Sequence, residues 1–169
     1  LIHKAQRNPV RVVFPEGEEE KILRACDVLL DEGIAKPILL GNETRIRQRA
    51  EELRLDAGAF HIVDPKKSPT LARYTAEFYS LRQRKGVTQK EAAQAILDPV
   101  SYGSMMVRLG DADALVAGLT RHYPDTLRPA LQVIPIREGC SKVSGMYMLI
   151  TPRGQVYFLA DTTVNIEPA

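Results

Sequence analysis

Hydrophobic positions in the first part of the chain fall into short runs separated by amphipathic segments. The runs are Val10 to Phe14, Pro37 to Leu40 and Phe60 to Val63. Each has the length and the bounding turn residues of a buried strand. Between them, an apolar stripe from Ile22 to Leu30 and alternating charges from Glu43 to Arg54 indicate helices. This alternation predicts a parallel sheet with helices on its faces.

The middle of the chain continues with helical segments and one more strand. Helices are predicted for Pro69 to Lys85, for Thr88 to Leu97, which opens with a capping box, and for Ser101 to Leu109. Ala114 to Ala117 is a further buried strand, and a helix follows from about Asp125 to Ile134. The expected fold is therefore a three-layer, open and mostly parallel α/β sheet of the Rossmann-like type.

The hydrophobic pattern changes in the last part of the chain. Val143 to Thr151 and Gln155 to Ala160 are β-rich, and Pro152-Arg153-Gly154 joins them as in a hairpin. We therefore expect an α/β subdomain over residues 1–137. Residues 138–169 would be the beginning of a second, β-rich subdomain.

Composition and charge narrow the classes of partner. The net charge is +2 with 26% charged residues, so we expect no electrostatic field that recruits nucleic acid or an anionic membrane. No apolar run has the length of a membrane span, and Leu1-Ile2-His3-Lys4 does not resemble a signal peptide. No metal-ligand spacing appears. A cytoplasmic location is expected, and the missing initiator Met indicates a start inside a longer chain.

The segment after Ala114 to Ala117 is the best candidate for chemistry, because ligands of open α/β sheets bind beyond the carboxyl ends of strands. Thr120 and Tyr123 carry hydroxyls there. Arg121 and Arg128 can each present a forked donor to a phosphate or carboxylate. The alternative is that both arginines are solvated and that the segment only caps the next helix.

Two further side chains enter as weaker candidates. Arg82 lies four residues after Phe78, on the apolar side of the predicted long helix. It is placed either for a partner or with its stem along the apolar surface. His122 is a conceivable general base, but spacing assigns it no serine, cysteine or carboxylate partner. The sequence therefore predicts no catalytic residue.

Motifs spread over essentially all 169 residues resemble the phosphate acetyl/butyryltransferase family. In chain order they are Phe14-Pro15-Glu16-Gly17-Glu18, Gly33 to Asn42, Val63-Asp64-Pro65, Leu81-Arg82…Lys85-Gly86, Tyr102 to Met106, Gly110 to Asp113, Asp125 to Ala130 and Ala160-Asp161. More narrowly, the chain is similar to the version fused to the C-terminus of bacterial malic enzymes. That likeness rests on Arg82 to Thr88, Gly118 to Pro124 and Asp161 to Asn165.

The resemblance implies an acetyl-CoA-sensing regulatory module of an NADP-dependent malic enzyme. In such enzymes other domains of the same chain decarboxylate malate to pyruvate with NADP and a divalent metal, and the assembly is expected to be a homo-oligomer. The module itself would hold no cofactor and would bind acetyl-CoA or a related acyl-CoA. One alternative is an active phosphate acetyltransferase that moves acetyl between phosphate and CoA. Another is an interaction element without a ligand.

The resemblance also implies site residues. Arg82 and Arg128 match arginines that bind substrate anions in active members, and the two guanidinium groups are expected to converge on one anion pocket. With Thr120, Arg121 and Tyr123 they form the candidate ligand site.

Two departures from the family pattern favour sensing over catalysis. His122, Tyr123 and Pro124 stand where active members commonly have small hydroxyl residues. The family's Ser-Arg-Gly catalytic segment lies beyond residue 169. The resemblance further implies a ligand cleft between two subdomains, the second completed by later sequence.

Overall fold

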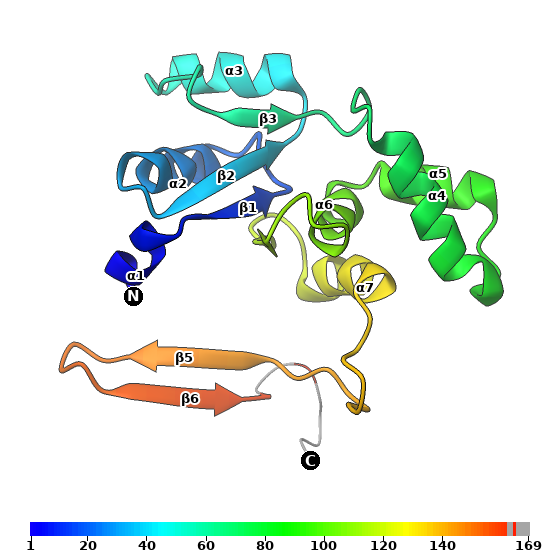
Figure 1. Cartoon of the computed structure of the whole chain (residues 1–169). Coiled ribbons are helices and arrows are strands. Elements are labelled where there is room, and N and C mark those ends of the chain that lie inside the picture. The colour runs from blue at the N-terminus through cyan, green and yellow to red at the C-terminus, as the bar shows by residue number, and fades with distance from the viewer. Residues whose placement is uncertain (162–163, 165–169) are drawn as a thin grey trace. The chain divides into compact units, whose positions relative to one another are not determined.

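The structure is a computed structural model in which residues 1–161 and 164 are described (Figure 1). The chain divides into two compact units, Leu1–Ile134 and Pro135–Ala169. The domain limits inferred from sequence, 1–137 and 138–169, stay a prediction. The resemblance motif over residues 161–165 lies mostly outside the described residues.

The first unit alternates strands and helices, much as the hydrophobic pattern predicts. Its elements are α1 (Ile2–Arg7), β1 (Val10–Phe14), α2 (Glu20–Asp31), β2 (Ala35–Leu40), α3 (Glu43–Glu52), β3 (His61–Val63), α4 (Leu71–Arg82), the 3-10 helix η1 (Gln83–Lys85), α5 (Gln89–Ile96), α6 (Pro99–Arg108), β4 (Ala114–Leu115) and α7 (Tyr123–Val133). Several predicted bounds shift by about two residues. The fourth strand ends two residues early, α6 begins at Pro99 and not at Ser101, and the last helix begins at Tyr123 and not at about Asp125.

The four strands form one parallel sheet in the order β3-β2-β1-β4. From β1 the chain moves outward to β2 and β3, and it then returns to β4 on the other side of β1 (Figure 1). The direction of winding therefore changes between β1 and β4. Such a switch point leaves a crevice at the carboxyl ends of the strands, where ligands of this architecture bind.

Each face of the sheet has its own core, because successive strand residues point to opposite sides. Ile38 and Leu40 pack with residues of α4, α5 and α6, whereas Leu39 packs with α2 and α3. Gly103 brings α6 close to the sheet, because a Cβ there would lie 2.6 Å from Leu115 Cδ1. The three-layer, parallel α/β fold predicted from sequence is confirmed.

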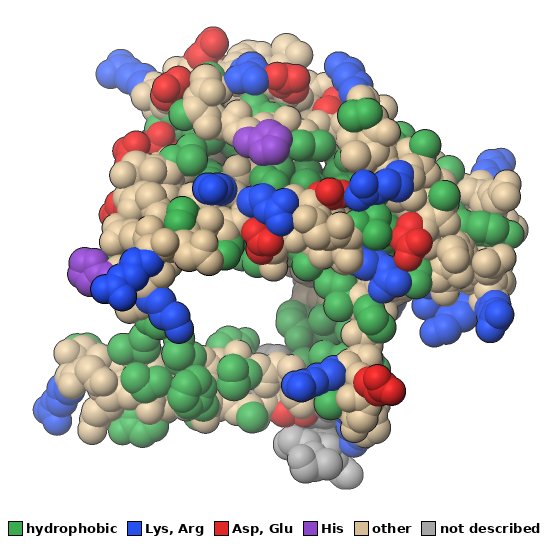
Figure 2. Space-filling view, in the orientation of Figure 1, with side chains coloured by type: hydrophobic (Ala, Val, Ile, Leu, Met, Phe, Trp, Pro, Cys, Tyr) green, Lys and Arg blue, Asp and Glu red, His purple; other side chains and the backbone are tan. Residues whose placement is uncertain are grey.

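The second unit contains the predicted hairpin. Strands β5 (Met146–Ile150) and β6 (Val156–Ala160) pair antiparallel, and Gly154 takes a φ of 78° in the turn between them. Every residue of both strands is exposed, and large apolar side chains occupy both faces of the ribbon. Apolar side chains dominate this part of the molecule in the space-filling view (Figure 2).

The described residues include neither a membrane-spanning helix nor a metal-binding cluster. None of their helices combines the length and apolarity that a membrane span requires. Among the same residues, no group of three or more His, Cys, Asp or Glu side chains is placed to hold a metal ion. On the visible face of the first unit, acidic and basic side chains are interspersed (Figure 2).

Candidate functional site

The carboxylate of Glu16 joins the two loops that diverge at the switch point. Glu16 lies in the β1–α2 loop (residues 15–19), and its bonding partners lie in the β4–α7 loop (residues 116–122). Oε2 accepts hydrogen bonds from the backbone N–H of Gly118 at 2.9 Å and of Leu119 at 3.0 Å. Oε1 accepts from the N–H of Thr120 at 2.5 Å and from its hydroxyl at 2.6 Å. Four donors from one loop thus surround a single carboxylate.

Glycine at two positions lets the loops take these paths. Gly118 has a φ of 111°, a conformation that side chains rarely allow. Gly17 lies against the end of β2, where its N–H donates to Leu40 O at 3.1 Å and a Cβ would lie 2.7 Å from that oxygen. The β1–α2 loop is therefore fixed against the sheet, and Glu16 extends from a backbone segment that is held in place.

The same contacts keep Glu16 ionised. Partial burial by itself raises the pKa of the Glu16 carboxyl, but hydrogen bonds from the Thr120 hydroxyl and from the N–H groups of Leu119, Thr120 and Gly118 outweigh it. The net effect is a pKa below the ordinary glutamate value. Glu16 therefore places a negative charge in the loop at neutral pH.

Arg121 fastens the same loop to α6. Its Nη1 lies 2.6 Å from Oδ1 of Asp98, and the two side chains are 32% and 29% exposed. Asp98 is also the N-cap of α6, because its Oδ2 accepts from the N–H of Ser101 at 3.0 Å. The guanidinium predicted to meet a ligand anion is thus paired with a carboxylate of the protein.

Cavities flank the β4–α7 loop on two sides, and Arg121 lines both. The first, of about 220 Å³, also borders the β1–α2 loop and Thr120. The second, of about 340 Å³, is lined by Leu115, Ala117, Gly118, Arg121, Tyr123, Thr126, Leu127 and Ala130. The structure therefore brings Thr120, Arg121 and Tyr123 to one loop between two cavities. Their contact with a ligand stays a prediction.

The other two predicted residues lie on helices. Arg128 is exposed on α7, and its side chain makes no ion pair or hydrogen bond with the residues that the structure describes. Arg82 ends α4, and its Nε is buried without an acceptor among the described residues. Neither residue lines the four cavities described for the molecule. Their convergence on one anion pocket stays a prediction.

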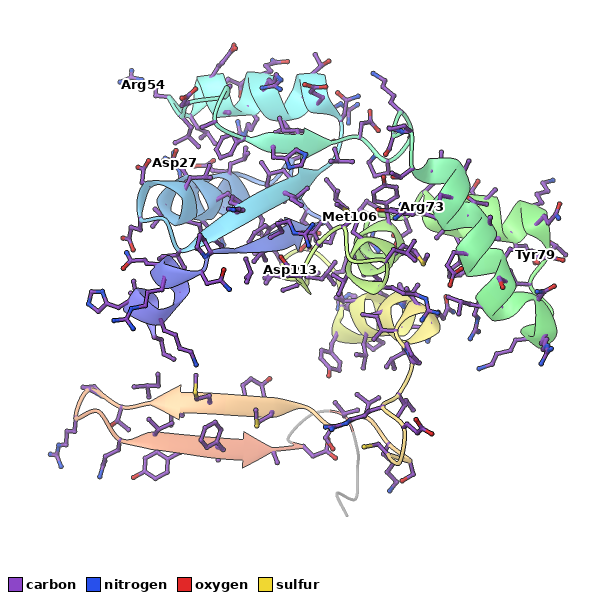
Figure 3. The ribbon with its side chains drawn as sticks, in the orientation of Figure 1. Asp27, Arg54, Arg73, Tyr79, Met106 and Asp113 are labelled. Atoms are coloured by element: carbon purple, nitrogen blue, oxygen red, sulfur yellow. The ribbon has the colours of Figure 1, made fainter. Side chains whose placement is uncertain are left out.

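The largest of these cavities, about 450 Å³, lies beside β3 and was not anticipated from the sequence. Met106 of α6 lines it, and Arg73 of α4 forms an ion pair with one of its carboxylates (Figure 3). The charged side chains in its lining are Glu43, Asp64, Lys67 and Asp111. Because acidic groups outnumber basic ones, this cavity is poorly suited to an anionic ligand.

Comparisons with known proteins agree with this geometry. Residues 1–169 match the family described as phosphate acetyl/butaryl transferase. The chain is 40% identical to a phosphate acetyltransferase of Thermoanaerobacterium thermosaccharolyticum, covering 99% of this chain and 52% of the relative. It is 37% identical to an NADP-dependent malic enzyme of Escherichia coli, covering 99% of this chain and 22% of the relative.

A solved structure gives the same result. The phosphotransacetylase from Streptococcus pyogenes superposes with a TM-score of 0.90 at 30% identity, covering 99% of this chain and 51% of that one. The chain thus spans about half the length of the phosphate acetyltransferase and about a fifth of the malic enzyme. The resemblance stated from motifs is confirmed, and the chain belongs to the phosphate acetyl/butaryl transferase family.

Proposed function

We propose that this chain is an acetyl-CoA-binding regulatory module of an NADP-dependent malic enzyme and does not transfer acetyl groups itself. The observation that carries the proposal is that polar donors of the β4–α7 loop are already engaged. Thr120 is bonded to Glu16, and Arg121 is paired with Asp98. Transfer chemistry needs preorganised donors aimed at charge that develops in the transition state. Binding needs only a few groups that orient the ligand.

Two arginines supply the donors for an anionic ligand. The Arg128 guanidinium is exposed and has no partner in residues 1–161. The buried Nε of Arg82 lacks an acceptor in the described part of the chain, and an unsatisfied buried donor costs about 1–3 kcal/mol. A ligand oxygen that reached this atom would remove that cost. Both groups suit the phosphates of acetyl-CoA or of a related acyl-CoA.

Regulation requires that acetyl-CoA bind two states of the enzyme with different affinities. The module would act on malic enzyme catalytic domains in the same polypeptide, within a homo-oligomer in the cytoplasm. NADP and the divalent metal would belong to those domains and not to this chain. The whole arrangement predicts no nucleic acid or membrane partner.

Calorimetry of acetyl-CoA with the full-length protein tests the proposal. We expect saturable binding, weakened about tenfold by Arg128→Ala, because a charged hydrogen bond contributes about 1.5–3 kcal/mol. Arg7→Ala is the matched control, since Arg7 is an exposed arginine of α1. Absence of binding, or equal affinities for the wild type and Arg128→Ala, would contradict the proposal.

The second candidate is an active phosphate acetyltransferase, the name carried by several of the relatives. The unpaired Arg128 favours it, because a free guanidinium can hold a phosphoryl group during transfer. Thioester formation from acetyl phosphate and CoA by the full-length protein decides between the candidates. Turnover would overturn the regulatory proposal, whereas no turnover in a folded protein that binds CoA would exclude the transferase.

A further inference from the structure

Glu16 was not among the residues predicted for the ligand site, yet it makes the densest set of contacts there. We infer that Glu16 is a positioning residue that holds the β4–α7 loop in the conformation that binds the acyl-CoA. The inference rests on the proposed function for the identity of the ligand. The contacts between Glu16 and the loop do not depend on that function.

The geometry of the loop suits a single anionic acceptor at this point. The N–H groups of Gly118, Leu119 and Thr120 are consecutive, and all three point at the Glu16 carboxylate. Successive amides that converge in this way form a concave site for an anion. Water can bond each amide separately, but it does not tie the three to one fixed point. The side chain of Glu16 does so from a loop that is fixed against β2.

The consequence reaches the ligand residues through chain continuity. Thr120 is bonded directly by Glu16, Arg121 is the next residue, and Tyr123 begins α7. Arg121 also lines both cavities beside the loop. If Glu16 releases the loop, Thr120 loses this anchor, and Arg121 keeps its ion pair with Asp98 but follows a residue that is no longer held. Glu16 itself lines the smaller of these cavities, and we expect its effect on ligand affinity to act through the position of the loop.

Charge alone predicts the opposite effect of Glu16 on ligand affinity. Glu16 is negative and lies in a site proposed to bind an anion, so Coulomb repulsion predicts tighter binding once its charge is removed. That repulsion is screened over about 10 Å at ordinary ionic strength. Hydrogen bonds to an ionised carboxylate are about twice as strong as neutral ones. We therefore expect the loss of loop order to outweigh the loss of repulsion.

The test compares Glu16→Gln with the wild type in the full-length protein. A glutamine has one acceptor oxygen, and its amide would direct N–H groups at N–H donors of the loop. We expect Glu16→Gln to bind acetyl-CoA about tenfold more weakly. We also expect faster hydrogen exchange at the amides of residues 118–120, measured by mass spectrometry without ligand. Glu51→Gln, which removes an exposed charge from α3, should change neither quantity.

The acetyl-CoA affinity and the hydrogen-exchange rate together distinguish failure of the positioning role from failure of the proposed function. Unchanged exchange at residues 118–120 in Glu16→Gln would overturn the positioning role, as would unchanged or tighter acetyl-CoA binding with faster exchange. Tighter binding would mean instead that the ligand anion competes with Glu16 for the amides. If the wild type does not bind acetyl-CoA, the proposed function is wrong, and exchange alone decides whether Glu16 orders the loop.

Discussion

The pairing of β1 with β4 is held at its two ends by carboxylates in different ways. The strands share only the pairs Val12↔Ala114 and Val13↔Leu115. At the amino end, Asp113 accepts from the Arg11 backbone N–H at 2.8 Å and from its guanidinium at 2.8–3.0 Å. At the carboxyl end, Glu16 accepts four bonds from residues 118–120.

The difference lies in what neutralises the negative charge. Asp113 faces a guanidinium, so its charge is balanced, and the contact ties one strand to the other. Glu16 faces neutral amides and a hydroxyl, so its charge remains, and the contact shapes a loop. The amino end therefore serves stability, whereas the carboxyl end serves the conformation of the ligand site. Substitutions at one end of the β1–β4 pairing test whether stability and ligand binding are in fact governed by different ends.

The largest expected effect comes from Gly103, which packs against the Val13↔Leu115 pair of these two strands. Its substitution by alanine would place Cβ 2.6 Å from Leu115 Cδ1 and 3.4 Å from Val13 Cγ1. We expect Gly103→Ala to lower the free energy of unfolding by about 1–3 kcal/mol, because overpacking forces side chains or backbone to shift. Denaturant unfolding measures this. Ser80→Ala, at an exposed site on α4, should leave the free energy of unfolding nearly unchanged. An equal decrease in both variants would contradict the explanation by overpacking.

A smaller effect is expected at the carboxyl end from the Thr120 hydroxyl. Thr120→Val removes one of the four donors to Glu16 and keeps the shape of the side chain, whereas Thr120→Ser keeps the donor. We expect Thr120→Val to weaken acetyl-CoA binding a few-fold, in line with about 1 kcal/mol for one hydrogen bond. Thr120→Ser should bind like the wild type. Equal affinities of the valine and serine variants would show that the hydroxyl does not matter.

The smallest effect is expected at the amino end, at Asp113. Hydrogen bonds from the Arg11 side chain and backbone lower the pKa of Asp113 from 3.8 to about 2. A carboxyl with a depressed folded-state pKa stabilises the fold above its unfolded pKa, and this contribution disappears as pH falls through about 2. We expect Asp113→Asn to lower the melting temperature slightly at neutral pH, because the pair is exposed.

Acidification and ligand binding then distinguish the two ends. The stability difference between Asp113→Asn and the wild type should shrink as pH falls toward 2, and acetyl-CoA affinity should be equal in the two proteins at neutral pH. A clear loss of affinity in Asp113→Asn would show that the amino end also shapes the ligand site. The proposed division between the two ends would then be wrong.

The elements of the fold follow from local pattern, and the contacts that shape the site do not. Runs such as Val10–Phe14 identify strands because burial of apolar side chains requires no knowledge of distant sequence. The bonds of Glu16 join residues that are 102 to 104 positions apart, and nothing in the local sequence records them. From the sequence, Glu16 stands out only as part of the family motif Phe14 to Glu18.

The arginines also show that local sequence does not reveal the partner of a side chain. Sequence reasoning placed Arg121 correctly in a loop after a strand, but it could not see that Asp98 would pair with it. Arg82 was placed on the apolar side of its helix, and the burial of its Nε fits that placement. A side chain's partner depends on how distant elements pack. The sequence therefore indicated which residues carry charge near the switch point and left open which of them remain free.

The hairpin β5–β6 has a practical consequence for every measurement on this chain. Its residues are exposed and apolar on both faces, with Met146 68% and Phe158 63% exposed. A two-stranded ribbon also presents unpaired backbone groups along both long edges, and such edges recruit strands from other molecules. Apparent affinities and melting temperatures of the isolated 169-residue chain should therefore drift with protein concentration, and dilution series are needed before any variant is compared with another.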